Sequence, residues 1–149
     1  MNVELVAVQL QPGSGSIKDI VAKAADHCLL VKAEPDIMCL PEAWIWKNSV
    51  MPGHELRNVY SLAVEAFTRV ATELGTYVAL GGIPSSTANG DFVSSPVIDP
   101  SGNVVGEQLK THLFRGEKTR FQPGTTLEIF KMGDLNVGIL VCHDIVFPE

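Results

Sequence analysis

The chain has 149 residues, 46% hydrophobic and 19% charged, which is the composition of one globular domain with a real core. Its net charge is −6 and its 11 Lys and Arg residues are scattered, which argues against nucleic-acid binding. No secretory signal is recognisable, and no stretch approaches the roughly 20 apolar residues of a membrane span. Three cysteines, an odd number, favour free thiols in a reducing compartment, so we expect a cytoplasmic protein.

The first half of the chain alternates between strand and helix patterns. Residues 3–8 form a near-continuous apolar run, typical of a strand that is covered on both faces. Ser16 is placed to cap a helix with apolar residues at three- and four-residue spacing. The short apolar stretch "DIMCL" predicts a buried strand that ends just before Glu42. A second helix is predicted over residues 59–74, and "TYVALGGIP" predicts a third strand.

The second half of the chain has the pattern of antiparallel strands. Residues 92–98 and 104–110 flank "DPSGN", a turn with Pro at its second position, so together they predict a hairpin. A polar loop, "THLFRGEKTRFQPGTT", leads to "LEIFKMG", a turn at "DLN" and a final strand "VGILVC". The prediction is a single α/β domain over residues 1–149, with a mixed sheet and two main helices.

Cys142 is the cysteine whose setting suggests chemistry. It ends an apolar strand, and a strand-to-helix elbow would place its sulfur near backbone amides that favour a thiolate and bind an oxyanion. Cys28 and Cys39 lie within apolar patterns and are predicted to be core residues. The sequence "HELRN" has Asn58 where a zinc protease motif needs its second histidine, so we expect no metal site.

Two further residues are predicted to reach the same edge of the sheet as Cys142. Glu42 follows the strand "DIMCL", and Lys110 ends the hairpin strand "VVGEQLK". Each alone would be interpreted as a solvated surface charge. Together they supply a base and a cation beside a nucleophile, which favours covalent catalysis.

Three segments resemble the catalytic segments of the nitrilase, or carbon–nitrogen hydrolase, superfamily: "LPEAW", "LKTHLF" and "GILVCHDIVFPE". The resemblance implies that Cys142 attacks, Glu42 acts as general base and acid, and Lys110 stabilises the tetrahedral intermediate. It also implies that Glu117 supports the site and that the backbone amide of His143 helps to hold the oxyanion. The reaction so implied uses no cofactor.

The same resemblance implies a four-layer αββα sandwich, of which 149 residues would form only the N-terminal part. We therefore expect a fragment that is truncated after the nucleophile elbow, has little or no activity alone and associates with copies of itself through uncovered apolar surface. Family members usually carry a Tyr-Asn pair where this chain has Phe92 and Val93, so the hydrogen bonding of that strand is expected to differ.

Three functions are compatible with these residues. The first is a cysteine hydrolase that cleaves non-peptide C–N bonds of small amides; an amide is favoured over a nitrile because Asp144 follows two positions after the thiol. The second is a catalytically silent or regulatory binding module of the same fold. The third is an N-acyltransferase that passes the thioester to an amine. Incubation with small amides, with and without an acceptor amine, would separate the three.

Overall fold

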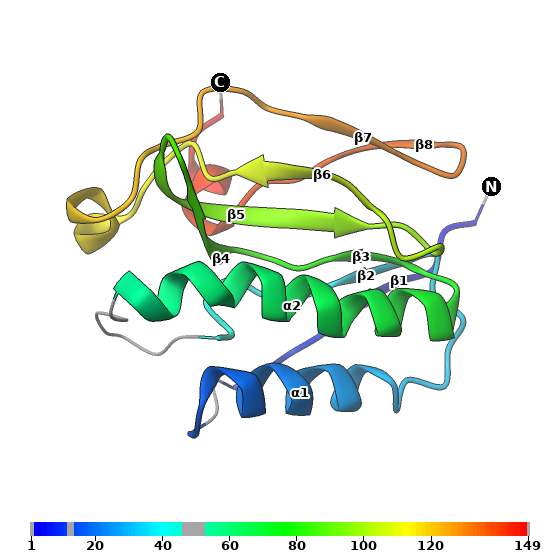
Figure 1. The fold of residues 1–149 in the computed structure, drawn as a ribbon. Helices are drawn as coiled ribbons and strands as arrows, with labels where there is room; N and C mark the ends of the chain where they lie inside the picture. The colour runs from blue at the N-terminus through cyan, green and yellow to red at the C-terminus, as the bar shows by residue number, and fades with distance from the viewer. Residues whose placement is uncertain (1, 12–13, 46–52, 149) are drawn as a thin grey trace.

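The structure, a computed structural model, describes residues 2–11, 14–45 and 53–148, with residues 53–57 by their backbone alone (Figure 1). It contains eight strands, two α-helices and two short 3-10 helices in this part of the chain. In chain order these are β1 (Leu5–Ala7), α1 (Ile17–Cys28), β2 (Ile37–Cys39), α2 (Gly53–Leu74), β3 (Tyr77–Ala79), β4 (Ile83–Thr87), β5 (Gly90–Ile98), β6 (Val104–Leu109), η1 (Arg115–Thr119), β7 (Ile129–Met132), β8 (Leu135–Gly138) and η2 (Cys142–Val146).

The main sheet is mixed, as predicted for this chain. Strands β1, β2 and β3 pair in parallel, and β5 then pairs antiparallel with β3, β4 and β6. The long strand β5 thus joins the parallel part of the sheet to the antiparallel part. The predicted hairpin around "DPSGN" is confirmed as β5 and β6, with Asp99 accepting the backbone N–H of Asn103 at 2.9 Å in the turn.

The expectation of one strand over "TYVALGGIP" is wrong. The segment forms two strands, β3 and β4, separated at residues 80–82. Gly81 has a φ of 65°, and a Cβ on it would lie 2.1 Å from the carbonyl oxygen of Pro41. The chain bends here because only glycine adopts this conformation so close to a neighbouring backbone.

Helix α1 begins as its cap predicts. The Ser16 hydroxyl accepts the backbone N–H of Asp19 at 3.2 Å, and the Asp19 carboxylate accepts the backbone N–H of Ser16 at 3.3 Å. Helix α2 begins six residues before the predicted start, because the apolar stripe used for the prediction is first evident at Val59. Within the described residues, neither helix combines the length and apolar character needed to cross a membrane.

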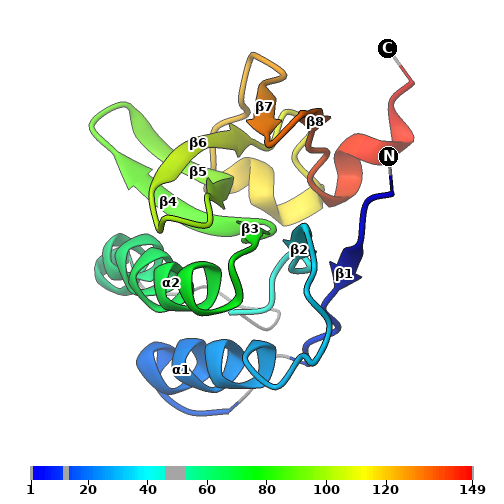
Figure 2. The same cartoon turned by 90° about the vertical axis from the view of Figure 1, so that its right-hand side faces the viewer.

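The sheet separates two apolar clusters. Figure 2 shows α1 and α2 on one side of the sheet and the β7–β8 hairpin on the other. Because successive side chains of a strand point to opposite faces, Met38 packs toward the helices while Ile37 packs toward the hairpin. On the hairpin side, Phe130 and Met132 complete the smaller cluster, and the Tyr77 hydroxyl accepts the backbone N–H of Gly133 at 3.0 Å.

The last strand is shorter than predicted. The sequence predicts a strand that continues to Cys142, but β8 ends at Gly138, which pairs with Ile129 at the start of β7. The residue before β7 contacts the main sheet instead of the hairpin, because the backbone N–H of Glu128 donates to the side chain of Gln108 in β6 at 2.8 Å. Beyond Gly138 the strand therefore has no ladder partner in β7.

Candidate active site

Glu42 is held at the end of β2 by the bend between β3 and β4. The backbone N–H of Ala43 donates to the carbonyl of Gly82 at 3.1 Å, and the buried Trp44 indole donates to the carbonyl of Leu80 at 2.8 Å. Gly82 leaves space for the acid: a Cβ there would lie 2.7 Å from Cγ of Glu42. The Glu42 carboxylate is 16% exposed. The "LPEAW" segment thus fixes this side chain between two bends of the backbone.

Lys110 is the centre of the site. Its side chain is fully buried, and Nζ lies 2.5 Å from Oε1 of Glu42 and 2.8 Å from Oε2 of Glu117. Its backbone is held as well, because its N–H donates to Val93 at 2.8 Å and its carbonyl accepts from Gly124 at 2.8 Å. Val93, one of the two positions that depart from the family pattern, therefore positions Lys110 through its backbone.

The two carboxylates keep Lys110 charged. Burial acts to lower the pKa of this ammonium, but the hydrogen bonds and negative charges of Glu117 and Glu42 outweigh burial and hold the pKa above its usual value. The fully buried Lys110 thus contacts two partly exposed carboxylate side chains at once.

Glu117 lies in η1, where it also caps the turn. Its Oε2 accepts the backbone N–H of Phe114 at 2.7 Å, while the same carboxylate contacts Lys110. The carboxylate of Glu117 therefore does two things: it caps the short helical turn in which it lies, and it contacts Lys110. The two residues are seven positions apart in the chain.

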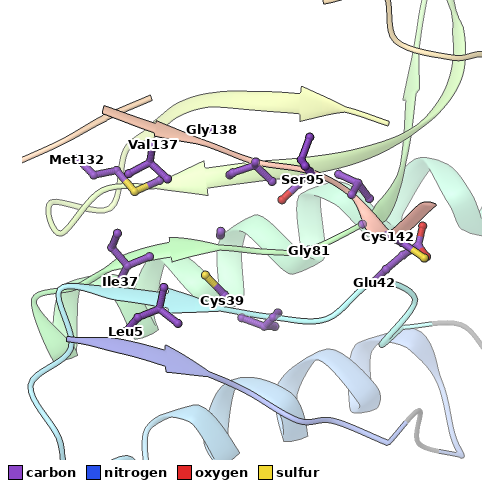
Figure 3. Close-up of a pocket in the computed structure, with 16 residues that line it drawn as sticks. Leu5, Ile37, Cys39, Glu42, Gly81, Ser95, Met132, Val137, Gly138 and Cys142 are labelled. Atoms are coloured by element: carbon purple, nitrogen blue, oxygen red, sulfur yellow. The ribbon is translucent and has the colours of Figure 1, made fainter. Parts of the chain in front are cut away.

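Cys142 is the first residue of η2 and has a φ of 46°, a left-handed conformation that is uncommon outside glycine. Figure 3 shows its thiol beside the carboxylate of Glu42. Both residues line a cavity of about 300 Å³ between the main sheet and the chain that follows β8 (Figure 3). Cys142 is exposed, whereas Cys28 is buried and Cys39 is half-buried.

The elbow differs from the sequence expectation in two respects. Cys142 is itself the first residue of a five-residue 3-10 helix, and the pKa of its thiol is raised instead of lowered. Burial, then the hydrogen bond and charge of Glu42, raise the pKa of Cys142 to about 11, while Lys110 acts in the opposite direction. The raised pKa favours the protonated thiol, which lies beside the Glu42 carboxylate (Figure 3).

The left-handed positions are concentrated in this site. Among the described residues, those with positive φ that are not glycine are Ala43, Arg115 and Cys142. Each lies in a different segment of the site: beside Glu42, in η1 and at the elbow. Backbone strain of this kind gathers where side chains must be placed against local preference.

Asp144 joins the elbow to the segment after Lys110. Its side chain is buried and accepts the backbone N–H groups of Val141 at 3.1 Å and His112 at 2.6 Å, and the hydroxyl of Thr111 at 2.9 Å. Burial acts to raise the pKa of this carboxyl, but these hydrogen bonds outweigh it and hold the pKa below its usual value. The sequence indicates a role for Asp144 in the turn, but not its partners about 32 positions away.

His143 follows Cys142 in η2, so its backbone N–H belongs to the first turn after the thiol. Its ring packs edge-on against Phe114 at 5.0 Å between ring centres and against Phe147 at 5.2 Å. The oxyanion role predicted for its backbone amide stays a prediction. The aromatic contacts of the ring were not predicted, because Phe114 lies in a loop 29 positions earlier and has no periodic signal.

Two of the three residues converge at the expected edge of the sheet. Because β6 is antiparallel to β5 and β5 is antiparallel to β3, β6 runs in the same direction as β2, so Glu42 and Lys110 both follow carboxyl ends at one edge of the main sheet. Cys142 instead follows the separate β7–β8 hairpin. The structure nevertheless brings Glu42, Lys110 and Glu117 into direct contact, with Cys142 beside Glu42.

Comparison with known proteins identifies the family of the chain. A family model described as carbon-nitrogen hydrolase matches residues 5–149. A nitrilase from Pyrococcus abyssi is 36% identical over 83 residues, which is 54% of this chain and 30% of that protein. An (R)-stereoselective amidase from a Pseudomonas species is 24% identical over 153 positions, covering 100% of this chain and 54% of that protein.

Solved structures share the fold. A carbon–nitrogen hydrolase superfamily protein from Xanthomonas campestris superposes with a TM-score of 0.87 at 20% identity, over 98% of this chain and 55% of the other. The chain spans about a third to about half of the length of the two curated relatives named above. Because the family model matches nearly every residue, the chain belongs to the carbon–nitrogen hydrolase family.

Proposed function

We propose that this chain carries the catalytic residues of a cysteine hydrolase that converts small amides to acids through a thioester. The observation that carries the proposal is the position of the Cys142 thiol beside the carboxylate of Glu42 (Figure 3), which is itself paired with the buried Lys110 at 2.5 Å. This arrangement combines a nucleophile, a base and a fixed positive charge.

The first half of the reaction transfers the thiol proton. Glu42 accepts the proton of Cys142 as sulfur forms a bond to the amide carbon, and the carbonyl oxygen becomes an oxyanion. The ammonium of Lys110 and the backbone N–H of His143 would hold this charge, and loss of one such donor typically costs about 100- to 1,000-fold in rate. Glu42 then gives its proton to the departing amine as the C–N bond breaks.

The second half returns the site to its resting state. Glu42 takes a proton from water as the water oxygen adds to the thioester carbon. The C–S bond then breaks, the acid leaves and the proton returns to sulfur. The raised pKa of Cys142, about 11, supports this order, because the thiol holds its proton until a substrate is in place.

The contacts of the two carboxylates support the assignment of Glu42 over Glu117 as the base. Both carboxylates contact Lys110, but Glu42 is the one that lies beside the thiol (Figure 3). Glu117 is occupied by the backbone N–H of Phe114, so its role is to hold Lys110 in place.

The test is a trapping experiment on the purified chain. We expect turnover by this chain alone to be slow, so a small amide should leave an acyl group on the peptide that contains Cys142, detected by mass, with a low but measurable release of ammonia. The Cys142→Ala variant should lose both signals and the Cys28→Ala variant neither. Ammonia release that persists in Cys142→Ala would refute the mechanism.

A second arm separates the alternative functions. Addition of an acceptor amine should leave the acid as the main product; an N-acyl amine as the main product would favour the transferase. Binding of the amide without acylation of Cys142 would favour a silent module.

A further inference from the structure

A second cavity lies next to the site, on the side of η1 and η2. It has a volume of about 430 Å³, and its lining includes Thr111, His112, Lys118, Phe121, His143 and Phe147. Three of these residues directly follow a site residue: Thr111 follows Lys110, Lys118 follows Glu117, and His143 follows Cys142. Since consecutive Cα atoms are about 3.8 Å apart, the cavity adjoins all three segments.

Positive charge is concentrated around this cavity. Residues 110–120 contain four of the 11 Lys and Arg residues of the chain and one of its 17 acidic residues, Glu117, which is paired with Lys110. Lys118 and two histidines line the cavity, and no carboxylate does so among the described residues. Two acidic residues adjoin the lining: Glu117, which is paired with Lys110, precedes Lys118, and Asp144 contacts His112 at 3.1 Å. Lys118 therefore supplies the permanent positive charge in the lining of this cavity.

The walls of the cavity are flat and apolar. The rings of His112 and Phe147 stack at 3.7 Å with an angle of 9° between their planes, and the His143 ring stands edge-on to Phe147. Phe121 adds a further aromatic wall. Such surfaces accommodate a planar, apolar body, and polar groups then fix its orientation.

We propose that this cavity binds an organic carboxylate, with the Lys118 ammonium as the counter-charge and the aromatic walls against its apolar part. The anion has two potential sources: a carboxylate carried by the amide substrate itself, or a separate carboxylate ligand. The first source rests on the proposed function, and the second does not.

The binding test uses benzoate and, as a neutral molecule of the same size, benzyl alcohol. Benzoate should bind the chain and shift the resonances of His112 and His143, and its affinity should fall about tenfold in Lys118→Gln. Lys131→Gln, which removes an exposed lysine on β7, should bind benzoate like the unmodified chain. Benzyl alcohol should show no dependence on residue 118. Equal benzoate affinity in Lys118→Gln and the unmodified chain would overturn the proposal.

A kinetic test separates the two sources. If the substrate carries the carboxylate, Lys118→Gln should raise KM for 4-carboxybenzamide by about tenfold and leave benzamide unchanged. If the anion is a separate ligand, the variant should lose benzoate binding while the ratio between the two amides stays the same.

Failure of this inference is distinguishable from failure of the proposed function. Benzoate binding that depends on Lys118 in a chain that hydrolyses neither amide would support the carboxylate site and contradict the hydrolase. Hydrolysis of both amides with benzoate binding unaffected by Lys118→Gln would do the reverse.

Discussion

The carboxylate of Asp144 accepts the backbone N–H of His112 at 2.6 Å. This bond connects the segment that follows Lys110 with the elbow that presents Cys142, although the two segments leave different sheets. The same carboxylate accepts the backbone N–H of Val141, directly before the thiol. Asp144 therefore sets the position of the proposed nucleophile relative to the proposed oxyanion site without contacting either.

Replacement of Asp144 by Asn should loosen this connection. An amide oxygen accepts these N–H groups without a charge, so we expect a loss of about 2 kcal/mol of stability and a lower melting temperature. Any amidase activity should fall because Cys142 and Lys110 are no longer held in register. Asp134→Asn, which changes an exposed carboxylate in the β7–β8 turn, is the control and should melt like the unmodified chain. An Asp144→Asn chain of unchanged melting temperature would contradict this role.

The pH dependence of stability should contain a contribution from the same carboxyl. Its pKa is lower in the folded chain than when unfolded, so it stabilises the fold above its unfolded pKa, about 4. This contribution is lost as pH falls through the folded pKa. Urea unfolding between about pH 3 and 7 should show a steeper acid loss in the unmodified chain than in Asp144→Asn. If the free energy of unfolding changed with pH in the same way in both chains, this contribution from Asp144 would be contradicted.

Cys142 should be the cysteine that iodoacetamide modifies first in the folded chain. The pKa values of Cys28 and Cys142 are both raised to about 11, so exposure decides, and Cys142 is the exposed one. Peptide mass mapping measures the order of modification. Faster labelling of Cys28 or Cys39 would contradict the expectation.

Replacement of Glu42 by Gln should separate thiol ionisation from turnover. The hydrogen bond and charge of Glu42 raise the pKa of Cys142, so their removal should lower that pKa and speed alkylation near about pH 8. Turnover should fall in the same variant because the base is gone. Alkylation that slows in Glu42→Gln would show that the carboxylate activates the free thiol instead.

Replacement of Lys110 by Met should destabilise the chain. It leaves two carboxylates facing each other in a buried space, and breaking a buried ion pair typically costs about 3–5 kcal/mol. Lys18→Met, which removes an exposed lysine on α1, is the control. Combining Lys110→Met with Glu42→Gln should recover part of the loss, measured by urea unfolding. Full additivity of the two changes would mean that the pair is not coupled.

Gly82→Ala should disturb the site by steric contact with Glu42 and Val141. The added Cβ would lie 2.7 Å from Cγ of Glu42 and 2.8 Å from Cγ1 of Val141, so both side chains or the backbone of residue 82 must shift, at a cost of about 1–3 kcal/mol. Gly116→Ala meets no atom within 4 Å and is the matched control in η1. Alkylation kinetics of Cys142 would report the displacement, and identical kinetics in both variants would contradict it.

Local signals in the sequence predict the parts of the fold that depend on neighbouring residues. Ser16 and the spacing of apolar residues predict α1 because a cap and one helix face are properties of a single segment. The "DPSGN" turn predicts the β5–β6 hairpin in the same way. The split at Gly81 and the early end of β8 depend on contacts with Pro41 and Gln108, far away in the chain, which periodicity cannot detect.

In the candidate site, too, some features are predicted from local sequence and others depend on contacts between distant residues. The resemblance of three segments predicts Glu42, Lys110 and Cys142 by residue, and the structure adds the distances from Lys110 to the carboxylates of Glu42 and Glu117. The contact between Lys110 and Glu42 spans 68 positions, and its geometry depends on the whole sheet. The raised pKa of Cys142 was not predicted because it comes from burial and from Glu42, neither of which is a neighbour in sequence.

The left-handed backbone at Ala43, Arg115 and Cys142 has an evolutionary consequence. Each such residue costs about 1–2 kcal/mol relative to glycine, offset in part by the greater entropy of an unfolded glycine. Selection for heat resistance alone would therefore favour glycine at all three positions, including the one that bears the thiol. Selection for turnover would oppose glycine at position 142 and tolerate it at position 43. Substitution patterns among descendants of this sequence would thus record which of the two pressures they had experienced.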